Sequence, residues 1–139
     1  MKVLIIFLIT FNAWAMSDEL IENEGVQTLL IKDQEEILIS FTAESPIQTL
    51  ISKNWLEIEN EKYLVTLWIK GAHGEALRIF HPKKKKMVYE LKASSPFVIT
   101  YKNGSIDIIK AEESLRNNPP KKYLINWTPE SESRKLIEE

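Results

Sequence analysis

The side chains able to perform acid–base, nucleophilic or metal chemistry are few in this sequence. It contains two histidines, His73 and His81, and no cysteine. Neither histidine belongs to a zinc-ligand spacing such as His-Glu-x-x-His, and without cysteine there is no thiol nucleophile and no cysteine-ligated metal site. We therefore expect no metal and no other cofactor, with His73 at the tip of a turn and His81 at the end of a strand.

Hydroxyl and carboxylate chemistry has no clear motif either. No Gly-x-Ser-x-Gly sequence accompanies the serines, histidines and aspartates of the chain. Glu57 and Glu59 would share one face of a strand, which would serve a glycosidase only if one carboxyl stayed protonated. A solvated strand face is the simpler interpretation, so the sequence predicts a protein that is not an enzyme.

Four consecutive lysines, Lys83, Lys84, Lys85 and Lys86, are the most conspicuous polar feature. Like charges repel one another, so these residues should lie in an exposed loop. Two interpretations stay open: the loop keeps the protein soluble and discourages edge-to-edge aggregation, or it contacts an acidic partner, a lipid head group or a cell-wall polymer. Gly71, His73 and Gly74 form a second candidate interaction segment, because loops on rigid β scaffolds commonly carry binding residues.

Charge is unevenly distributed along the chain. Residues 17–61 contain eleven acidic residues and two lysines, whereas residues 62–122 contain thirteen basic and five acidic residues. The net charge is only −2, and it leaves no broad basic face for counterion release. We therefore expect no nucleic-acid partner.

Short β-type runs separated by turn residues dominate the sequence from residue 26 onward. Residues 63–69 are apolar on both faces, as in a central strand, and Asn103-Gly104 is a strong hairpin sequence. These patterns predict an all-β fold, a small Ig-like β-sandwich of about seven to nine short strands with a short C-terminal extension. The expected strands are residues 26–31, 36–41, 47–52, 55–59, 63–69, 75–81, 87–92, 97–101 and 105–110.

The expected domain organisation follows from the same patterns. Residues 1–15 should be a signal peptide, 16–25 an acidic N-terminal segment and 26–110 the β-sandwich domain. Residues 111–139 should form the C-terminal extension, with a short helix at 111–116, a possible added strand at 123–127 and a polar tail from 129.

The signal-peptide prediction depends on the first fifteen residues. Lys2 precedes an apolar run at residues 3–11, and Ala13-Trp14-Ala15 ends it with a small-x-small pattern. The run is shorter than the ~20 residues of a membrane-spanning helix. We expect cleavage near Ala15, a periplasmic or secreted protein and no stable membrane anchor.

Four segments between residues 29 and 92 follow one another in a recognisable order. LLIKDQEEILISF holds two strands around a polar break, IQTLIS has the form Ile-x-x-Leu-x-Ser, YLVTLWIKGAHGEALRIF enters a glycine turn, and KKKKMVYELKA completes a hairpin. This order resembles the short N-terminal module of secretins, the outer-membrane channels of pilus and type II or III secretion machines. The resemblance implies a periplasmic binding and assembly domain without catalysis.

Two functional hypotheses follow. The first is a non-enzymatic exported module that docks on another cell-envelope protein in a secretion or pilus assembly, by pairing through an exposed edge strand or through the loops named above. The second is a secreted β-sandwich that binds a small ligand or polymer, such as a glycan, a lipid or an envelope polyanion. A glycan site would require exposed planar aromatic side chains among Trp55, Trp68 and Trp127.

Overall fold

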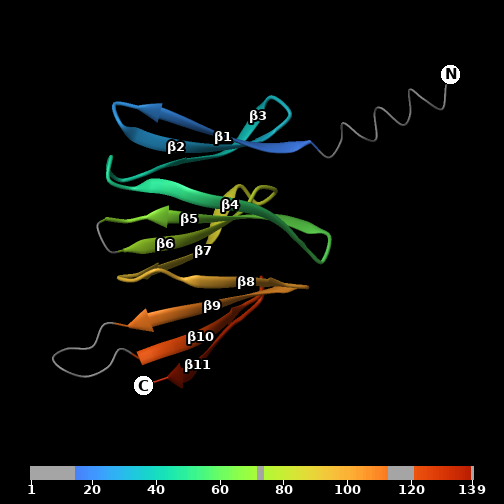
Figure 1. Cartoon of the computed structure of the whole chain (residues 1–139). Helices are drawn as coiled ribbons and strands as arrows, with labels where there is room; N and C mark the ends of the chain where they lie inside the picture. Colours follow the sequence, from blue (N-terminus) through green and yellow to red (C-terminus); the bar gives the residue numbers. More distant parts are fainter. Residues whose placement is uncertain (1–14, 72–73, 113–120, 139) are drawn as a thin grey trace. The chain divides into compact units, whose positions relative to one another are not determined.

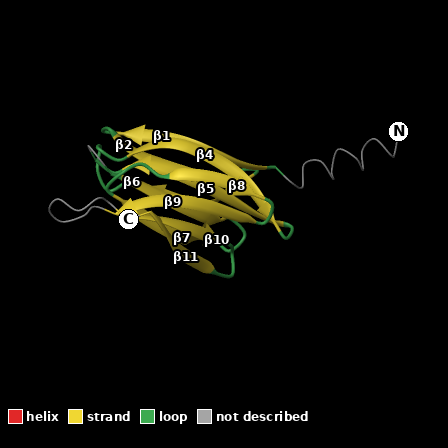
Figure 2. Ribbon diagram, turned by 60° about the horizontal axis from the view of Figure 1, so that its bottom comes forward, coloured by secondary structure: helices red, strands yellow, loops and turns green. Residues whose placement is uncertain are grey.

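The structure, a computed structural model, describes residues 15–71, 74–112 and 121–138. These residues form eleven β-strands and no helix (Figures 1 and 2), which confirms the all-β prediction. Among them there is no helix of the length and apolarity that a membrane crossing requires. The expected signal peptide, except Ala15, and His73 lie outside the described residues.

The chain divides into two compact units, Met1–Pro46 and Ile47–Glu139, here called the N-terminal and C-terminal units. The predicted domain boundaries at residues 26 and 110 therefore differ from the observed division. Met16–Asn23 pairs with Val26–Asp33 across the first predicted boundary. Ser105–Glu112 runs through the second boundary and pairs with Lys121–Trp127, so neither boundary separates two compact parts.

The N-terminal unit is an antiparallel sheet of β1 (Met16–Asn23), β2 (Val26–Asp33) and β3 (Glu36–Thr42), in that order. The predicted acidic segment at 16–25 is thus a strand and its turn, because all eight residues of β1 pair with β2. Glu24 and Gly25 both have positive φ, 52° and 80°, as the tight turn requires. Lys32 donates to the Glu19 carboxylate at 2.6 Å, which raises the pKa of Lys32.

The C-terminal unit contains two four-stranded antiparallel sheets. The first has the order β4-β5-β6-β7, with β4 (Thr49–Ile58), β5 (Glu61–Ile69), β6 (Glu75–His81) and β7 (Lys86–Ala93). The second has the order β11-β10-β9-β8, with β8 (Val98–Lys102), β9 (Ser105–Glu112), β10 (Lys121–Trp127) and β11 (Glu132–Glu138). Ig-like topology is not confirmed, because neighbouring strands here are consecutive in sequence and make none of the Greek-key connections of an Ig sandwich.

A single apolar cluster packs the two sheets of the C-terminal unit together. Burying each large aliphatic or aromatic side chain contributes about 1.5–3 kcal/mol, so the cluster is a major source of stability for this unit. Its buried members come from both sheets and include Tyr63, Val65, Leu77, Ile79 and Leu91 from the first, and Ile106, Ile108, Ile125 and Trp127 from the second.

The central strand β5 is buried on both faces, as its sequence predicts. Val65 faces the apolar cluster, while Leu64, Thr66 and Trp68 are buried on the opposite face of the sheet. The predicted hairpin at Asn103-Gly104 is also present between β8 and β9, with Gly104 at φ 88°.

Tyrosines lie between the edge strands of the two sheets. Tyr101 on β8 lies beside Asn54 on β4, and Tyr89 on β7 lies beside Glu132 and Arg134 on β11, where its buried hydroxyl has no hydrogen-bond partner among the described residues. Burial raises the pKa of both tyrosines. One tyrosine therefore lies between the two sheets at each long side of the sandwich.

Three predicted elements differ from the structure. Residues 47–52 and 55–59 are expected as two strands, but β4 is continuous, because a bulge at Ile51 absorbs the break in alternation. Residues 111–112 belong to β9, while the rest of the predicted helix lies outside the described residues. The polar tail contains β11. The residues of β11 have a weak strand propensity, but the backbone hydrogen bonds that they make with the edge of β10 outweigh it. The possible added strand at 123–127 is present as β10.

Candidate functional site

The lysine hairpin, defined as residues 83–86, connects β6 to β7. Lys83, Lys84, Lys85 and Lys86 are all exposed, as expected from their mutual repulsion. The turn is closed by a hydrogen bond from the Lys85 amide to the Pro82 carbonyl at 2.9 Å, with Lys85 at φ 55°. The chain therefore displays four cationic side chains on a short, hydrogen-bonded turn.

His81 holds the base of the lysine hairpin. Its side chain is buried, and its Nδ1 accepts a hydrogen bond from the Lys84 amide at 3.3 Å. Its Nε2 lies 2.7 Å from Glu61 Oε2 on the neighbouring strand β5. Because Nδ1 accepts a hydrogen bond, the proton of the neutral ring belongs on Nε2, the nitrogen beside Glu61. His81 is thus the acceptor that orders the turn, as well as the end of a strand.

Aromatic rings connect this base to the core. Tyr63 packs edge-on against His81, with ring centroids 4.8 Å apart, and against Trp127 at 5.8 Å. Trp127 also contacts Tyr89 on β7 at 5.8 Å. Burial raises the pKa of Tyr63, and the charges of Glu61 and other nearby acids raise it further. The backbone at the base of the lysine hairpin is therefore tied to both sheets.

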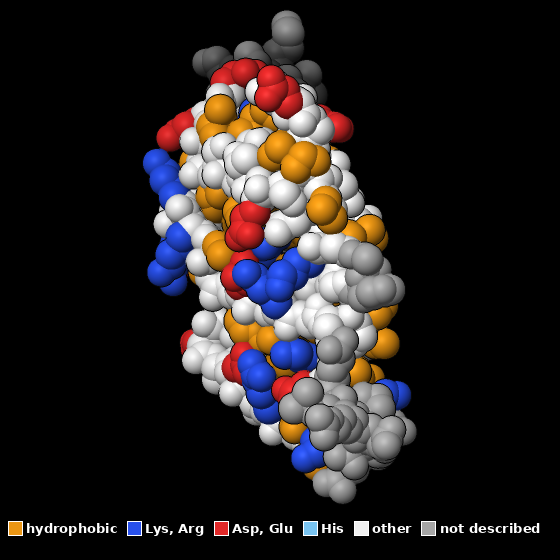
Figure 3. Space-filling model, turned by 90° about the vertical axis from the view of Figure 1, so that its left-hand side faces the viewer, with side chains coloured by type: hydrophobic (Ala, Val, Ile, Leu, Met, Phe, Trp, Pro, Cys, Tyr) orange, Lys and Arg blue, Asp and Glu red, His pale blue; other side chains and the backbone are white. Residues whose placement is uncertain are grey.

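Other turns at the same end of the C-terminal unit carry mixed charge. The β4–β5 turn contains Glu59 and Asn60, both at positive φ, and Glu59 lies close enough to Tyr63 to affect its pKa. Lys102, beside the β8–β9 turn, is paired with Asp107 at 2.5 Å. Figure 3 shows the Lys and Arg side chains of one face of the molecule in several separate groups, without a continuous basic surface.

The other predicted interaction residues lie elsewhere. Gly71 and Gly74 precede β6, whereas the lysine hairpin follows it, so the two predicted segments occupy opposite ends of that strand. The Lys70 amide donates to the Gly74 carbonyl at 2.8 Å and closes the turn between β5 and β6. Gly71 and Gly74 line two adjoining hollows at this end of the unit.

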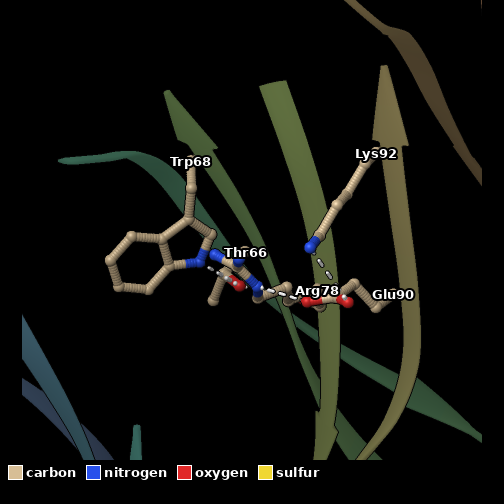
Figure 4. A network of polar contacts seen from close by, with 5 residues as sticks. All are labelled: Thr66, Trp68, Arg78, Glu90 and Lys92. Atoms are coloured by element: carbon tan, nitrogen blue, oxygen red, sulfur yellow. Dashed lines mark hydrogen bonds and ion pairs between the residues drawn. The ribbon is translucent and has the colours of Figure 1, made fainter. Parts of the chain in front are cut away.

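A buried polar network that sequence reasoning missed lies on β5, β6 and β7 (Figure 4). Trp68 Nε1 donates to Thr66 Oγ1 at 2.8 Å, and Thr66 Oγ1 donates to the Arg78 carbonyl at 2.9 Å. Arg78 Nε donates to Glu90 Oε2 at 2.9 Å, and its guanidinium carbon lies 5.6 Å from the centre of the Trp68 ring. Lys92 Nζ is 3.8 Å from the other oxygen of Glu90.

This network positions strands. Thr66 is directly opposite Arg78, and Arg78 is directly opposite Glu90, so a shift of register by one residue would separate each pair. The sequence does contain a hint of it, since the only polar interruptions of the apolar runs in β5 and β6 are Thr66 and Arg78. We regard the network as structural, because Thr66, Trp68 and Arg78 are all buried.

Comparison with protein-family models, with curated proteins and with solved structures finds no match. Within residues 15–71, 74–112 and 121–138, no three His, Asp or Glu side chains lie together as metal ligands would. Trp68 and Trp127 are buried and Trp55 is half-buried, so none of these three presents the fully exposed ring that a glycan site uses.

Proposed function

We propose that this chain is a non-catalytic docking module that binds an acidic surface of a partner protein through the lysine hairpin. The observation that carries the proposal is that four exposed lysines stand on a turn whose base is held by the buried His81. A loop needed only for solubility requires no such ordered base. Fixing the backbone in advance lowers the entropy lost when a partner binds.

The partner's chemistry follows from the charge of the loop. Ammonium groups are compact, strongly hydrated charges, which favour carboxylate-rich surfaces and contribute to the rate of encounter more than to buried contact area. Screening by salt should therefore weaken the complex strongly. Met87, beside the hairpin on β7, is 38% exposed and offers an apolar contact next to the charges.

The setting of the proposal is the cell envelope. The N-terminal apolar segment followed by Ala13-Trp14-Ala15 supports export, and the order of segments between residues 29 and 92 supports a role like that of secretin N-terminal modules. We place the module in the periplasm, docked on another envelope protein of a secretion or pilus assembly.

Site-specific cross-linking in the producing cells tests the proposal. A photo-reactive amino acid replaces Met87, next to the hairpin, in the otherwise unchanged chain. We expect one protein adduct of defined mass, whose yield falls at least tenfold when Lys83→Glu and Lys84→Glu are combined. Identification of an adduct partner with an acidic surface at the cross-linked position would support docking.

The matched control changes the same charge elsewhere. Lys121→Glu combined with Lys135→Glu alters two exposed lysines of β10 and β11 and gives the same net charge as the hairpin variant. The adduct should persist in this control at the original yield. An equal loss of adduct yield in both variants, or an unchanged adduct yield in the hairpin variant, would contradict docking through the lysine hairpin. An adduct with a polyanionic polymer in place of a protein would favour the ligand-binding alternative.

A further inference from the structure

A shallow hollow lies at the end of the C-terminal unit opposite the lysine hairpin. It has a volume of about 400 Å³, within the range of small-molecule sites. It is lined by Lys70, Gly71, Gly74, Lys92, Ala93 and Ser94. A second hollow of about 410 Å³ adjoins it, sharing Gly71, Gly74 and Ser94 and adding Ile69, Glu75, Ser95 and Pro96.

Two lysine side chains, those of Lys70 and Lys92, line this hollow, and the backbone packs closely at Gly74 beside it. A Cβ atom built on Gly74 would lie 3.2 Å from the Ala93 carbonyl oxygen and 3.5 Å from Lys70 Cβ. Glycine thus lets the backbone at the start of β6 lie close to Ala93 at the end of β7 and to Lys70, which follows β5. Both lysines are exposed and line the same hollow.

The nearby carboxylates are engaged elsewhere. Glu75 Oε2 accepts a hydrogen bond from the Phe97 amide at 2.9 Å. Glu90 Oε2 binds Arg78 at 2.9 Å, and its other oxygen is 3.8 Å from Lys92 Nζ, a loose contact. The first hollow is therefore lined by two lysines and no carboxylate, whereas Glu75, which keeps its negative charge, lines the adjoining hollow.

Hydroxyl groups complete the lining. Ser94 and Ser95 follow β7, and Ser95 Oγ is buried without a hydrogen-bond partner among the described residues. A buried hydroxyl without a partner is unfavourable, and an anionic oxygen that reached Ser95 from the second hollow would supply an acceptor. This hydroxyl is an observation separate from the two lysines.

We propose that the two adjoining hollows together bind a small phosphate monoester, with Lys70 and Lys92 on the phosphate oxygens. Lysines bind phosphate as point charges, serine hydroxyls donate to its oxygens, and glycine permits close approach to the backbone. Ile69, Ala93 and Pro96 supply the apolar wall for the esterified group. The site is independent of the lysine hairpin, since it lies at the other end of β6.

Titration of the full chain, labelled with ¹⁵N, tests the site. The probes are phenyl phosphate, inorganic phosphate and benzoate, added at constant ionic strength and followed by amide chemical shifts. We expect saturable shifts at Gly71, Gly74, Ser94 and Ser95 with phenyl phosphate, and weaker ones with inorganic phosphate. Shifts that do not saturate, or equal binding of benzoate, would overturn the assignment.

Single-residue variants test whether phenyl phosphate binds at this site, and their spectra show whether each variant is folded. Lys70→Met and Lys92→Met should each weaken phenyl phosphate at least tenfold, whereas Lys121→Met should leave its affinity unchanged. Gly71→Leu should block the hollow without straining the backbone, because Gly71 does not have positive φ and a Cβ there meets no atom within 4 Å. Unchanged affinity in the Lys70 and Lys92 variants, with native spectra, would show that the hollow is not the site.

Discussion

Two polar networks in the C-terminal unit share one geometry but differ in burial. In the first sheet, Arg78 on β6 lies directly opposite Glu90 on β7. In the second sheet, Asp107 on β9 lies directly opposite Asn126 on β10, which donates to it at 2.7 Å. The side chain of Arg78 is 1% exposed, whereas Lys102, the cation that pairs with Asp107, is 56% exposed.

The difference teaches how the surroundings set the energetic role of a cross-strand pair. A charge withdrawn from water must keep its partner, because losing it leaves the charge uncompensated. A pair whose cation reaches water is screened and gains little from the same contact. The first network should therefore hold the register of β5, β6 and β7, whereas the second should only adjust the stability of β9 and β10.

The largest expected effect is that of Glu90→Ala. It removes the carboxylate from the buried Arg78 and should cost about 3 kcal/mol of unfolding free energy, the lower end for a broken buried pair because Glu90 itself is partly exposed. Chemical denaturation measures the change. The double replacement Arg78→Met with Glu90→Met should be less destabilising than Glu90→Ala alone, and a larger loss in the double variant would refute the charge explanation.

A smaller effect is expected from Thr66→Val, which keeps the shape of the side chain and removes its hydroxyl. Trp68 Nε1 then loses its acceptor and the Arg78 carbonyl loses a donor, within a fully buried region. The expected cost is about 1–3 kcal/mol in the same denaturation measurement. Thr100→Val, at a position of β8 that is exposed, is the matched control and should change stability little.

The smallest effect should come from Asp107, and it should depend on pH. Hydrogen bonds from Lys102 and Asn126 lower the pKa of Asp107 in the folded state. Its contribution to stability is therefore present above the unfolded pKa of about 3.9 and is lost as pH falls through the lower folded value. Asp107→Asn should be less stable than the natural chain at pH 6, and the gap should close on acidification. A gap that widens in acid would reverse the assigned direction.

Sequence patterns located most strands and hairpins because these depend on neighbouring residues. The run at 63–69 predicted a strand buried on both faces, and β5 is one. Asn103-Gly104 predicted a hairpin, and β8 and β9 form it. The misses are polar strands such as β1 and β11, whose own residues carry no alternating apolar pattern and which form only because β2 and β10 offer an edge.

The candidate sites also combine features that neighbouring residues determine with features that depend on residues far apart in the chain. Four adjacent lysines are sufficient to predict an exposed, cationic loop, because their repulsion is local. The buried His81 at its base was expected only as the end of a strand, since its partner Glu61 is twenty residues away in the chain. The hollow beside Gly74 depends on how closely the backbone at Gly74 packs against Ala93 and Lys70, and the contact with Ala93 is not expressed by any local pattern.

The sequence by itself determined the all-β character of this protein, the places of its tight turns and the exposure of its lysine run, because alternation, turn chemistry and like-charge repulsion act over a few residues. The tertiary structure decided which polar residues became partners and where hollows formed. Arg78 meets Glu90, and Lys70 shares a hollow with Lys92, only after separate strands align in register. Burial then determines the energy of each contact, and burial is a property of the assembled sheets.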